Sequence, residues 1–475
     1  MSTPNVILCQ CDQLRAFEVG CYGNSVVRTP HIDRLAGQGV RFDLAVTNNP
    51  VCTPARACLL SGQYSRTCAG TADNVFQDPP PQERSRLRDT TIAEAFKQGG
   101  YDTALIGKWH TWGHPNLVGF DESIYPCTPH RHYGQQYFEN FDTEGFVIDE
   151  FTPDFEIARV REYLREHRGN DQKPFFLHYN ISPPHAPVGP GNAPQWYTDM
   201  YPPQDIPLRE NVFDDGVMAH SERWFKIYTI WDYFTRWMQK PTDRLPEGMT
   251  LRHLIGWYYG MVTVVDDMVG RLTATLEEFG LSDNTLIVFN SDHGDNLGSH
   301  QLFNKQCLYE ESIRIPLVLR LPGVIEPQTN CEQIAQTIDI MPTILDLCGL
   351  TVPASVQGRS LKTVLAGDAQ TLEDNVAFIE TDAIFFERPC IGIRTPTHLY
   401  SMKLGEDLRR IEDDAFWFFD MRQDPWQANN LIETGEQRDV AAELKDRLRT
   451  WNQQTPWLDA PACAGPTCEP PFLTR

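Results

Sequence analysis

The chain has 475 residues, and its 41 Lys and Arg stand against 64 Asp and Glu, for a formal net charge of −23. Such a negative charge argues against nucleic acid or an anionic membrane as a partner, so an anionic ligand would need a local positive site. The length and a hydrophobic content of 41% suit a large α/β domain with a smaller companion.

The N-terminal residues lead directly into an apolar run, without the charged and apolar regions of a signal peptide. No stretch of the chain is apolar enough to span a bilayer. The thirteen cysteines are scattered and odd in number, which favours a reduced protein over a disulfide framework. These features together predict a cytoplasmic protein.

The apolar run 5–11 is typical of a buried strand, and it ends in Asp12 and Gln13. Open α/β sheets place ligands at the carboxyl ends of parallel strands, so Asp12 is a candidate metal ligand. The amide oxygen of Gln13 could also ligate a hard cation, with one negative charge fewer. An acid at this place can equally be a helix cap.

Cys52 follows a turn-forming run, Asn48-Asn49-Pro50, and precedes good helix formers. A side chain there would project from a helix N-terminus, where free N–H groups and the macrodipole favour an anion. Arg56 would lie on the same helix face and could hold a second negative charge. The alternative is a buried structural cysteine beside a surface arginine.

Two further strands lead into basic residues. Residues 101–106 end in Gly107-Lys108-Trp109-His110, where Lys108 and His110 would face the same side. Residues 173–180 precede a proline-rich turn that fixes His185. Taken alone, such residues are usually solvated or form ordinary hydrogen bonds.

Residues 188–250 are irregular, and aromatic residues recur at helical spacing between 224 and 237. Such a pattern is more often core than cofactor contact. We treat the segment as an insertion that could line a substrate entrance or bury a subunit interface. A homo-oligomer is one of the states that this permits.

Residues 285–290 predict another buried strand, followed by Asp292 and His293, which can meet Asp12 across the sheet edge. Lys305 precedes the apolar run 313–319. Beyond about residue 366 the pattern alternates like antiparallel strands and ends in an amphipathic helix over 440–451. We therefore expect a catalytic domain over 1–365 and a C-terminal subdomain with a tail over 366–475.

The run Cys52-x-Pro54-x-Arg56, followed by Leu59-Leu60-x-Gly62, resembles the signature of the formylglycine-dependent sulfatases of the alkaline phosphatase superfamily. The segments around Lys108, His185, Asp292 and Lys305 occur in the family order, and the resemblance runs from residue 5 to about 451. It implies an α/β fold: an α/β/α sandwich with a large, mostly parallel mixed sheet, plus a smaller α+β subdomain with an antiparallel sheet.

The resemblance also implies chemistry. In this family the cysteine is oxidised to an aldehyde, formylglycine, whose hydrate is the nucleophile, so the implied partners are a formylglycine-generating enzyme and a small anionic sulfate ester. One divalent cation is implied, with Ca²⁺ as first choice and Mn²⁺ as alternative because a histidine softens the site. The implied metal ligands are Asp12, Gln13, Cys52, Asp292 and His293.

The remaining roles follow from the same resemblance. Lys305 or His185 would protonate the leaving oxygen, and His110 would deprotonate the hydrated aldehyde so that sulfate is expelled. The residues that would neutralise charge on the transferring group are Arg56, Lys108, His185 and Lys305.

Gln13 departs from the family, which usually has two acids at this place. Similar Asp-Gln pairs occur in the choline-sulfatase and phosphonate-monoester-hydrolase branches, so a phosphonate or phosphate-ester hydrolase on the same scaffold is one alternative. Lys108 and His110 favour sulfate, because the phosphonate branch replaces them with uncharged polar residues. The other alternative is an inactive relative that binds an anion or a protein, which would predict a damaged site.

Overall fold

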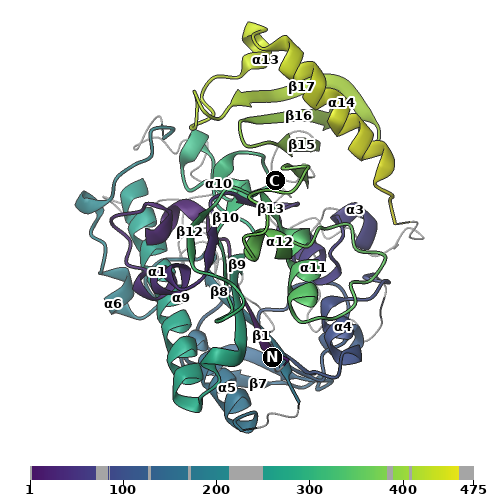
Figure 1. Ribbon diagram of the computed structural model, residues 1–475. Helices are drawn as coiled ribbons and strands as arrows, with labels where there is room; N and C mark the ends of the chain where they lie inside the picture. Colours follow the sequence, from purple (N-terminus) through teal and green to yellow (C-terminus); the bar gives the residue numbers. More distant parts are fainter. Residues whose placement is uncertain are drawn as a thin grey trace.

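The computed structural model describes residues 3–70, 84, 86–126, 130–169, 173–212, 250–381, 389–405 and 409–458. A ten-stranded mixed sheet, ordered β12-β2-β11-β9-β1-β8-β4-β5-β6-β7, runs through the larger part of the chain. Helices pack on both of its faces (Figure 1). The expected α/β/α sandwich is therefore confirmed.

The centre of this sheet is parallel. Strand β1 pairs in parallel with β8 and β9, and β4 pairs in parallel with β8 and β5, so the carboxyl ends of these strands meet at one edge. The strands are β1 (Asn5–Asp12), β2 (Val40–Phe42), β4 (Asp102–Gly107), β5 (Glu122–Pro126), β6 (Gln135–Glu139), β7 (Phe146–Ile148), β8 (Phe175–Pro184), β9 (Thr285–Ser291), β11 (Leu317–Arg320) and β12 (Gln328–Cys331).

Two hydrophobic cores lie on opposite faces of the sheet, and β1 contributes to both by alternation. Ile7 and Cys9 belong to one core, and Val6 and Leu8 to the other. The first core is covered by α1 (Pro30–Gly37), α5 (Thr152–Glu166), α6 (Gln195–Thr198) and α9 (Leu251–Phe279), and the second by α2 (Cys52–Ser61), α4 (Ile92–Gln98), α11 (Thr337–Leu347) and α12 (Lys362–Leu365).

Short elements connect these layers. A small second sheet consists of β3 (Ala45–Val46), β10 (Arg314–Ile315) and β13 (Ala335–Gln336). Short helices are α3 (Ser65–Cys68), α10 (Glu310–Ile313) and α13 (Leu431–Thr434), and 3-10 turns occupy Ala16–Glu18, Gly20–Tyr22, Pro115–Val118, Pro203–Asp205, Ser282–Asn284 and Ser299–Gln301.

The first part of the expected insertion is packed into the core. Tyr197 and Tyr201 are buried against α9, where a Cβ at Gly260 would lie 2.4 Å from the Tyr197 carbonyl oxygen and one at Gly256 2.5 Å from that of Tyr201. The glycines of α9 let the backbone at these two tyrosines approach closely, so the segment is anchored to the core there, while Trp196 beside them is 65% exposed. The aromatic run 224–237 lies outside the described residues.

The C-terminal part is the antiparallel sheet β14 (Ala377–Thr381), β15 (Cys390–Arg394), β16 (His398–Leu404) and β17 (Ile411–Asp420), on which α14 (Arg438–Gln454) packs. Figure 1 shows this sheet and helix beside the large domain. The antiparallel sheet expected beyond about residue 366 is thus confirmed. The tail beyond residue 458 lies outside the described residues.

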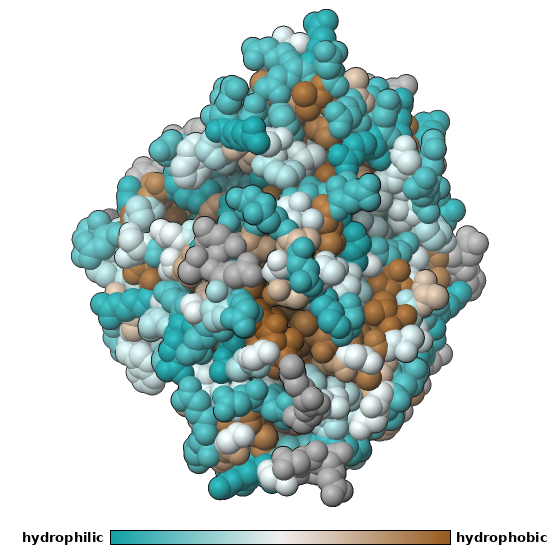
Figure 2. All heavy atoms as spheres, in the orientation of Figure 1, coloured by the Kyte–Doolittle hydropathy of each residue, from teal (hydrophilic) through white to brown (hydrophobic). Residues whose placement is uncertain are grey.

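Within the described ranges, no helix has the length and hydropathy needed to cross a membrane. Every cysteine that the structure describes is free. Figure 2 shows a mostly hydrophilic face with hydrophobic residues gathered near its middle, as a strongly charged chain with a large core predicts.

Candidate active site

The site lies where β1 and β9 end. Asp12 is the last residue of β1, and Asp292 and His293 directly follow β9. The parallel register sets Cys11 opposite Ser291, so the residues that come next meet at the sheet edge. Nε2 of His293 lies 3.6 Å from Oδ1 of Asp12 and 3.6 Å from Oδ1 of Asp292, with all three side chains fully buried.

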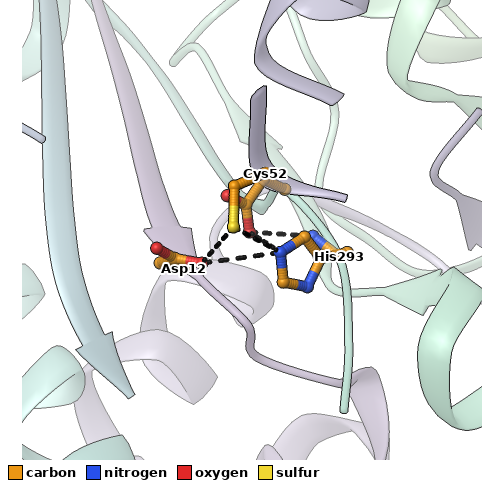
Figure 3. Close-up of side chains that lie close together, drawn as sticks. Asp12, Cys52 and His293 are labelled. Carbon is orange, nitrogen blue, oxygen red and sulfur yellow. Dashed lines mark hydrogen bonds and ion pairs between the residues drawn. The ribbon is translucent and has the colours of Figure 1, made fainter. Parts of the chain in front are cut away.

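Cys52 is the first residue of α2, and its side chain enters this cluster (Figure 3). Its sulfur lies 3.1 Å from Nε2 of His293 and 3.8 Å from Oδ1 of Asp12. Ligand atoms of Asp12, Cys52, Asp292 and His293 all lie within 4.8 Å of one another. One buried cluster therefore contains two carboxylates, an imidazole and a thiol.

Local hydrogen bonds fix the orientation of these groups. Nδ1 of His293 donates to the Gly294 carbonyl oxygen at 2.9 Å, so the lone pair of Nε2 faces Cys52 and Asp12. The amide N–H of Gln13 donates to Oδ1 of Asp292 at 3.0 Å. This donor set of carboxylate oxygens, an amide oxygen and an oriented imidazole fits a divalent cation.

Arg56 lies one helical turn after Cys52 and points into the same cluster. Its Nε and Nη2 lie 3.1 and 3.0 Å from Oδ2 of Asp292, and its Nη1 donates to Oδ1 of Asn180, on β8, at 2.9 Å. Lys108, after the end of β4, contacts Oδ2 of Asp12 with its Nζ. Asp12 and Asp292 thus each have a buried basic side chain beside them.

Lys305 contacts both the Cys52 cluster and His185. Its Nζ lies 2.7 Å from the Gln13 amide oxygen, 3.1 Å from the Cys52 sulfur and 3.0 Å from Nε2 of His185. The side chain is 3% exposed. An ammonium group is therefore held between the nucleophile position and His185.

Burial and neighbouring charges shift the pKa values of Asp292 and Cys52 in opposite directions. Burial alone would raise the pKa of Asp292, but the Arg56 guanidinium in contact with it holds this pKa below its usual range, so the carboxylate stays ionised. Burial raises the pKa of the Cys52 thiol, although Lys305 acts in the opposite direction. An unmodified Cys52 would therefore be a protonated and weak nucleophile at neutral pH.

Three histidines lie beside these charges. Burial lowers the pKa of His110 and of His185 well below the usual value, so both rings are neutral at pH 7. The ring of His130 stacks on His185 with centroids 3.6 Å apart, and the edge of His110 meets His130 with centroids 5.9 Å apart. His110 thus joins the cluster beside His130.

Most of the site residues predicted from the sequence lie together in the structure. His110 joins the cluster through the edge contact of its ring with His130, and the sequence analysis missed His130 and Asn180. Asn180 could have been found, because it too lies near the carboxyl end of a parallel strand, whereas no motif pointed to His130. The predicted residues that direct contacts join are Asp12, Gln13, Cys52, Arg56, Lys108, His185, Asp292, His293 and Lys305.

Known proteins share this architecture. The family model described as "Sulfatase" matches residues 4–350, and the one described as "N-sulphoglucosamine sulphohydrolase, C-terminal" matches residues 298–454. The chain is 30% identical over 462 residues to the ulvan-active sulfatase of Formosa agariphila, covering 94% of this chain and 80% of the relative. It is 30% identical over 512 residues to the N-acetylglucosamine-6-O-sulfatase of Bacteroides thetaiotaomicron, covering 95% and 86%.

A solved structure extends the likeness to three dimensions. That of BT4656 in complex with its substrate D-glucosamine-2-N,6-O-disulfate matches with a TM-score of 0.79 and 26% identity, covering 95% of this chain and 98% of the other. Both the large sheet and the C-terminal subdomain thus have counterparts of known structure.

Proposed function

The chain belongs to the sulfatase family. On this premise we propose that it hydrolyses sulfate monoesters and that Cys52, oxidised to formylglycine, supplies the nucleophile. One observation carries the proposal: Cys52 begins α2 in direct contact with His293, Asp12 and Lys305. The buried thiol has a raised pKa, which favours modification over direct thiolate chemistry at this place.

Positive charge at the site matches an anionic substrate. Arg56, Lys108 and Lys305 bring three basic side chains to two carboxylates, in a chain whose overall formal charge is −23. Burial lowers the pKa of Lys108, whereas the Asp292 carboxylate acts in the opposite direction. In a buried site these groups act with little screening, so they can stabilise the charge of a transferring sulfuryl group. His185, through Nε2, would add a fourth polar contact.

Asp12, Gln13, Asp292 and His293 would hold one divalent cation together with the modified Cys52. Such a cation, when bound, acts as a Lewis acid that polarises oxygen atoms of the nucleophile and the ester. The predominance of oxygen donors favours Ca²⁺, and the single imidazole keeps Mn²⁺ as the alternative.

Net hydrolysis breaks the ester S–O bond, adds the hydroxyl of water to sulfur and passes a proton to the departing alcohol oxygen. Lys305 and His185 are hydrogen-bonded to each other beside Cys52, so this pair would supply the proton to that oxygen. His110 is neutral because burial lowers its pKa, and it would take up the proton released as sulfate leaves.

The names of similar proteins suggest a class for the organic part of the ester. Two of the relatives reported above are named for sulfated carbohydrates, and the solved structure holds a sulfated amino sugar. We therefore propose carbohydrate sulfates as the natural class, with aryl sulfates as convenient reporters.

The test is kcat/KM for 4-nitrophenyl sulfate, N-acetylglucosamine 6-sulfate and the 4-nitrophenyl monoester of phenylphosphonate. The protein is produced with a formylglycine-generating enzyme, conversion is measured by mass spectrometry, and Cys52→Ala is the control. Sulfate turnover that disappears in the control supports the proposal. Preference for the phosphonate would assign the chain to the alternative hydrolase, and no turnover by converted protein would indicate an inactive relative.

A further inference from the structure

Among the site residues that the structure describes, three histidines are the most exposed. His110 and His185 are partly exposed and His130 is 7% exposed, whereas Cys52 and Arg56 are each 1% exposed. A substrate whose sulfate reaches Cys52 therefore has its organic part near these rings.

His130 holds His185 by stacking. The two rings are nearly parallel, with an interplanar angle of 10° and centroids 3.6 Å apart. Nδ1 of His185 donates to the Ala186 carbonyl oxygen at 2.6 Å, so its Nε2 carries the lone pair that meets Nζ of Lys305 at 3.0 Å. The ring has one orientation that serves both bonds, and His130 covers the face from which it could tilt away.

Asn192 joins the two loops that carry these rings. Its Nδ2 donates to the carbonyl oxygens of His130 and Pro187, at 3.2 and 2.7 Å, and its Oδ1 accepts from the N–H of His132 at 3.0 Å. Asn192 is 1% exposed, so these bonds are shielded from water. The spacing of the stacked pair is thus built into the backbone.

A second metal site does not explain this arrangement. Donor atoms of Asp12, His130 and His185 lie within 4.8 Å of one another. The Nζ atoms of Lys108 and Lys305, however, already contact Asp12 and Nε2 of His185. Another cation would have to displace both of them.

We propose that His130 is a positioning residue for protonation of the leaving oxygen, acting by holding the His185 ring in line with Lys305. The inference rests on the proposed function, because it assigns the proton to this pair. Loss of the stack lets the ring turn, and a displacement of about 1 Å in a reacting group costs on the order of 100-fold in rate.

The experiment compares two aryl sulfates whose leaving oxygens differ in basicity. The oxygen of 4-nitrophenyl sulfate departs with little need of a proton, whereas that of phenyl sulfate needs one. We expect His130→Ala to lower kcat on phenyl sulfate by about 100-fold and on 4-nitrophenyl sulfate by less than about 10-fold, with KM little changed. His130→Phe keeps a flat ring over His185 and should restore most of the kcat on phenyl sulfate.

Controls separate positioning from folding and maturation. Thermal unfolding and mass spectrometry check that each variant is folded and converted at Cys52, and His130→Gln replaces His130→Ala if the latter does not fold. His167 is the matched control, because its ring also packs on an aromatic ring, that of Tyr163, with centroids 4.3 Å apart. His167→Ala should leave both activities unchanged.

Equal losses on the two esters would overturn the inference, as would a His130→Phe variant as slow as His130→Ala. Either result would mean that His130 acts through its nitrogens or only through the fold. Failure of the proposed function is distinguishable, since the unmutated, fully converted enzyme would then hydrolyse neither sulfate.

Discussion

The sulfur of Cys52 lies 3.1 Å from Nε2 of His293, across 241 positions of the sequence. Cys52 begins a helix and His293 follows a strand, so the contact exists only because α2 starts above the ends of β1 and β9. This contact places Cys52 directly beside the candidate metal ligands.

Removal of the divalent cation should inactivate the enzyme. Two buried carboxylates, Asp12 and Asp292, share the site, and a bound cation neutralises their charge. We expect chelation to abolish sulfate hydrolysis and Ca²⁺ or Mn²⁺ to restore it, and a cation at 100 times its Kd should stabilise the fold by about 2.7 kcal/mol. Activity, metal analysis and thermal unfolding measure these effects.

Asp292→Asn should weaken the cation's effect on activity and on thermal unfolding, while Asp283→Asn, at an exposed turn, should not. Full activity of a protein shown to contain no metal would contradict the assignment.

Arg56 should matter for both stability and catalysis. Arg56→Ala leaves Asp292 buried without its main cation, which costs about 3–5 kcal/mol for a broken buried pair. Arg56→Lys should also lose most activity, because an ammonium group cannot bond Asp292 and Asn180 in the same fork. Urea unfolding and kcat/KM are the measurements.

The control is Arg34, whose ion pair with Glu277 is half exposed; Arg34→Ala should cost about 0–1 kcal/mol and no activity. An Arg56→Lys enzyme as active as the original would show that charge alone suffices.

A buried acid makes stability depend on pH. Burial raises the pKa of Glu156 to about 8 from an ordinary 4.5, and its carboxyl group accepts a hydrogen bond from the Tyr137 hydroxyl at 2.8 Å. Between these two values the folded state holds a proton that the unfolded state releases, so stability should fall as pH rises, by up to about 1.4 kcal/mol per pH unit.

Glu156→Gln is neutral at every pH, so it should flatten this slope between about pH 4.5 and 8 and be relatively more stable at the alkaline end. Urea unfolding across the pH range measures it. An unchanged slope in the variant would rule out Glu156 as the source.

The turn before Lys108 requires glycine. Gly107 has φ +94°, and a Cβ there would lie 2.0 Å from the Asn180 carbonyl oxygen. Gly107→Ala should therefore push β4 from β8, displace Lys108 and lower both stability and kcat/KM. Gly169→Ala is the matched control, because Gly169 also has a positive φ, +72°, but nothing lies within 4 Å of its Cβ. Equal costs in the two variants would mean that only backbone strain matters.

Local sequence pattern predicted the elements around the site. The apolar run before Asp12 and the run before Asp292 are strands, as predicted, and the turn before Cys52 does lead into a helix. These features depend on a few neighbouring residues, whose hydrophobicity and backbone preferences are visible in the chain.

Local sequence therefore identified the site residues that follow strands or begin α2, from Asp12 to His293. The packing of distant segments brings His130 onto His185 and Asn180 to Arg56, and it keeps Asp292 ionised. The reason is physical: such contacts join segments far apart in the chain, and strand order, register and burial set their distances and their electrostatics.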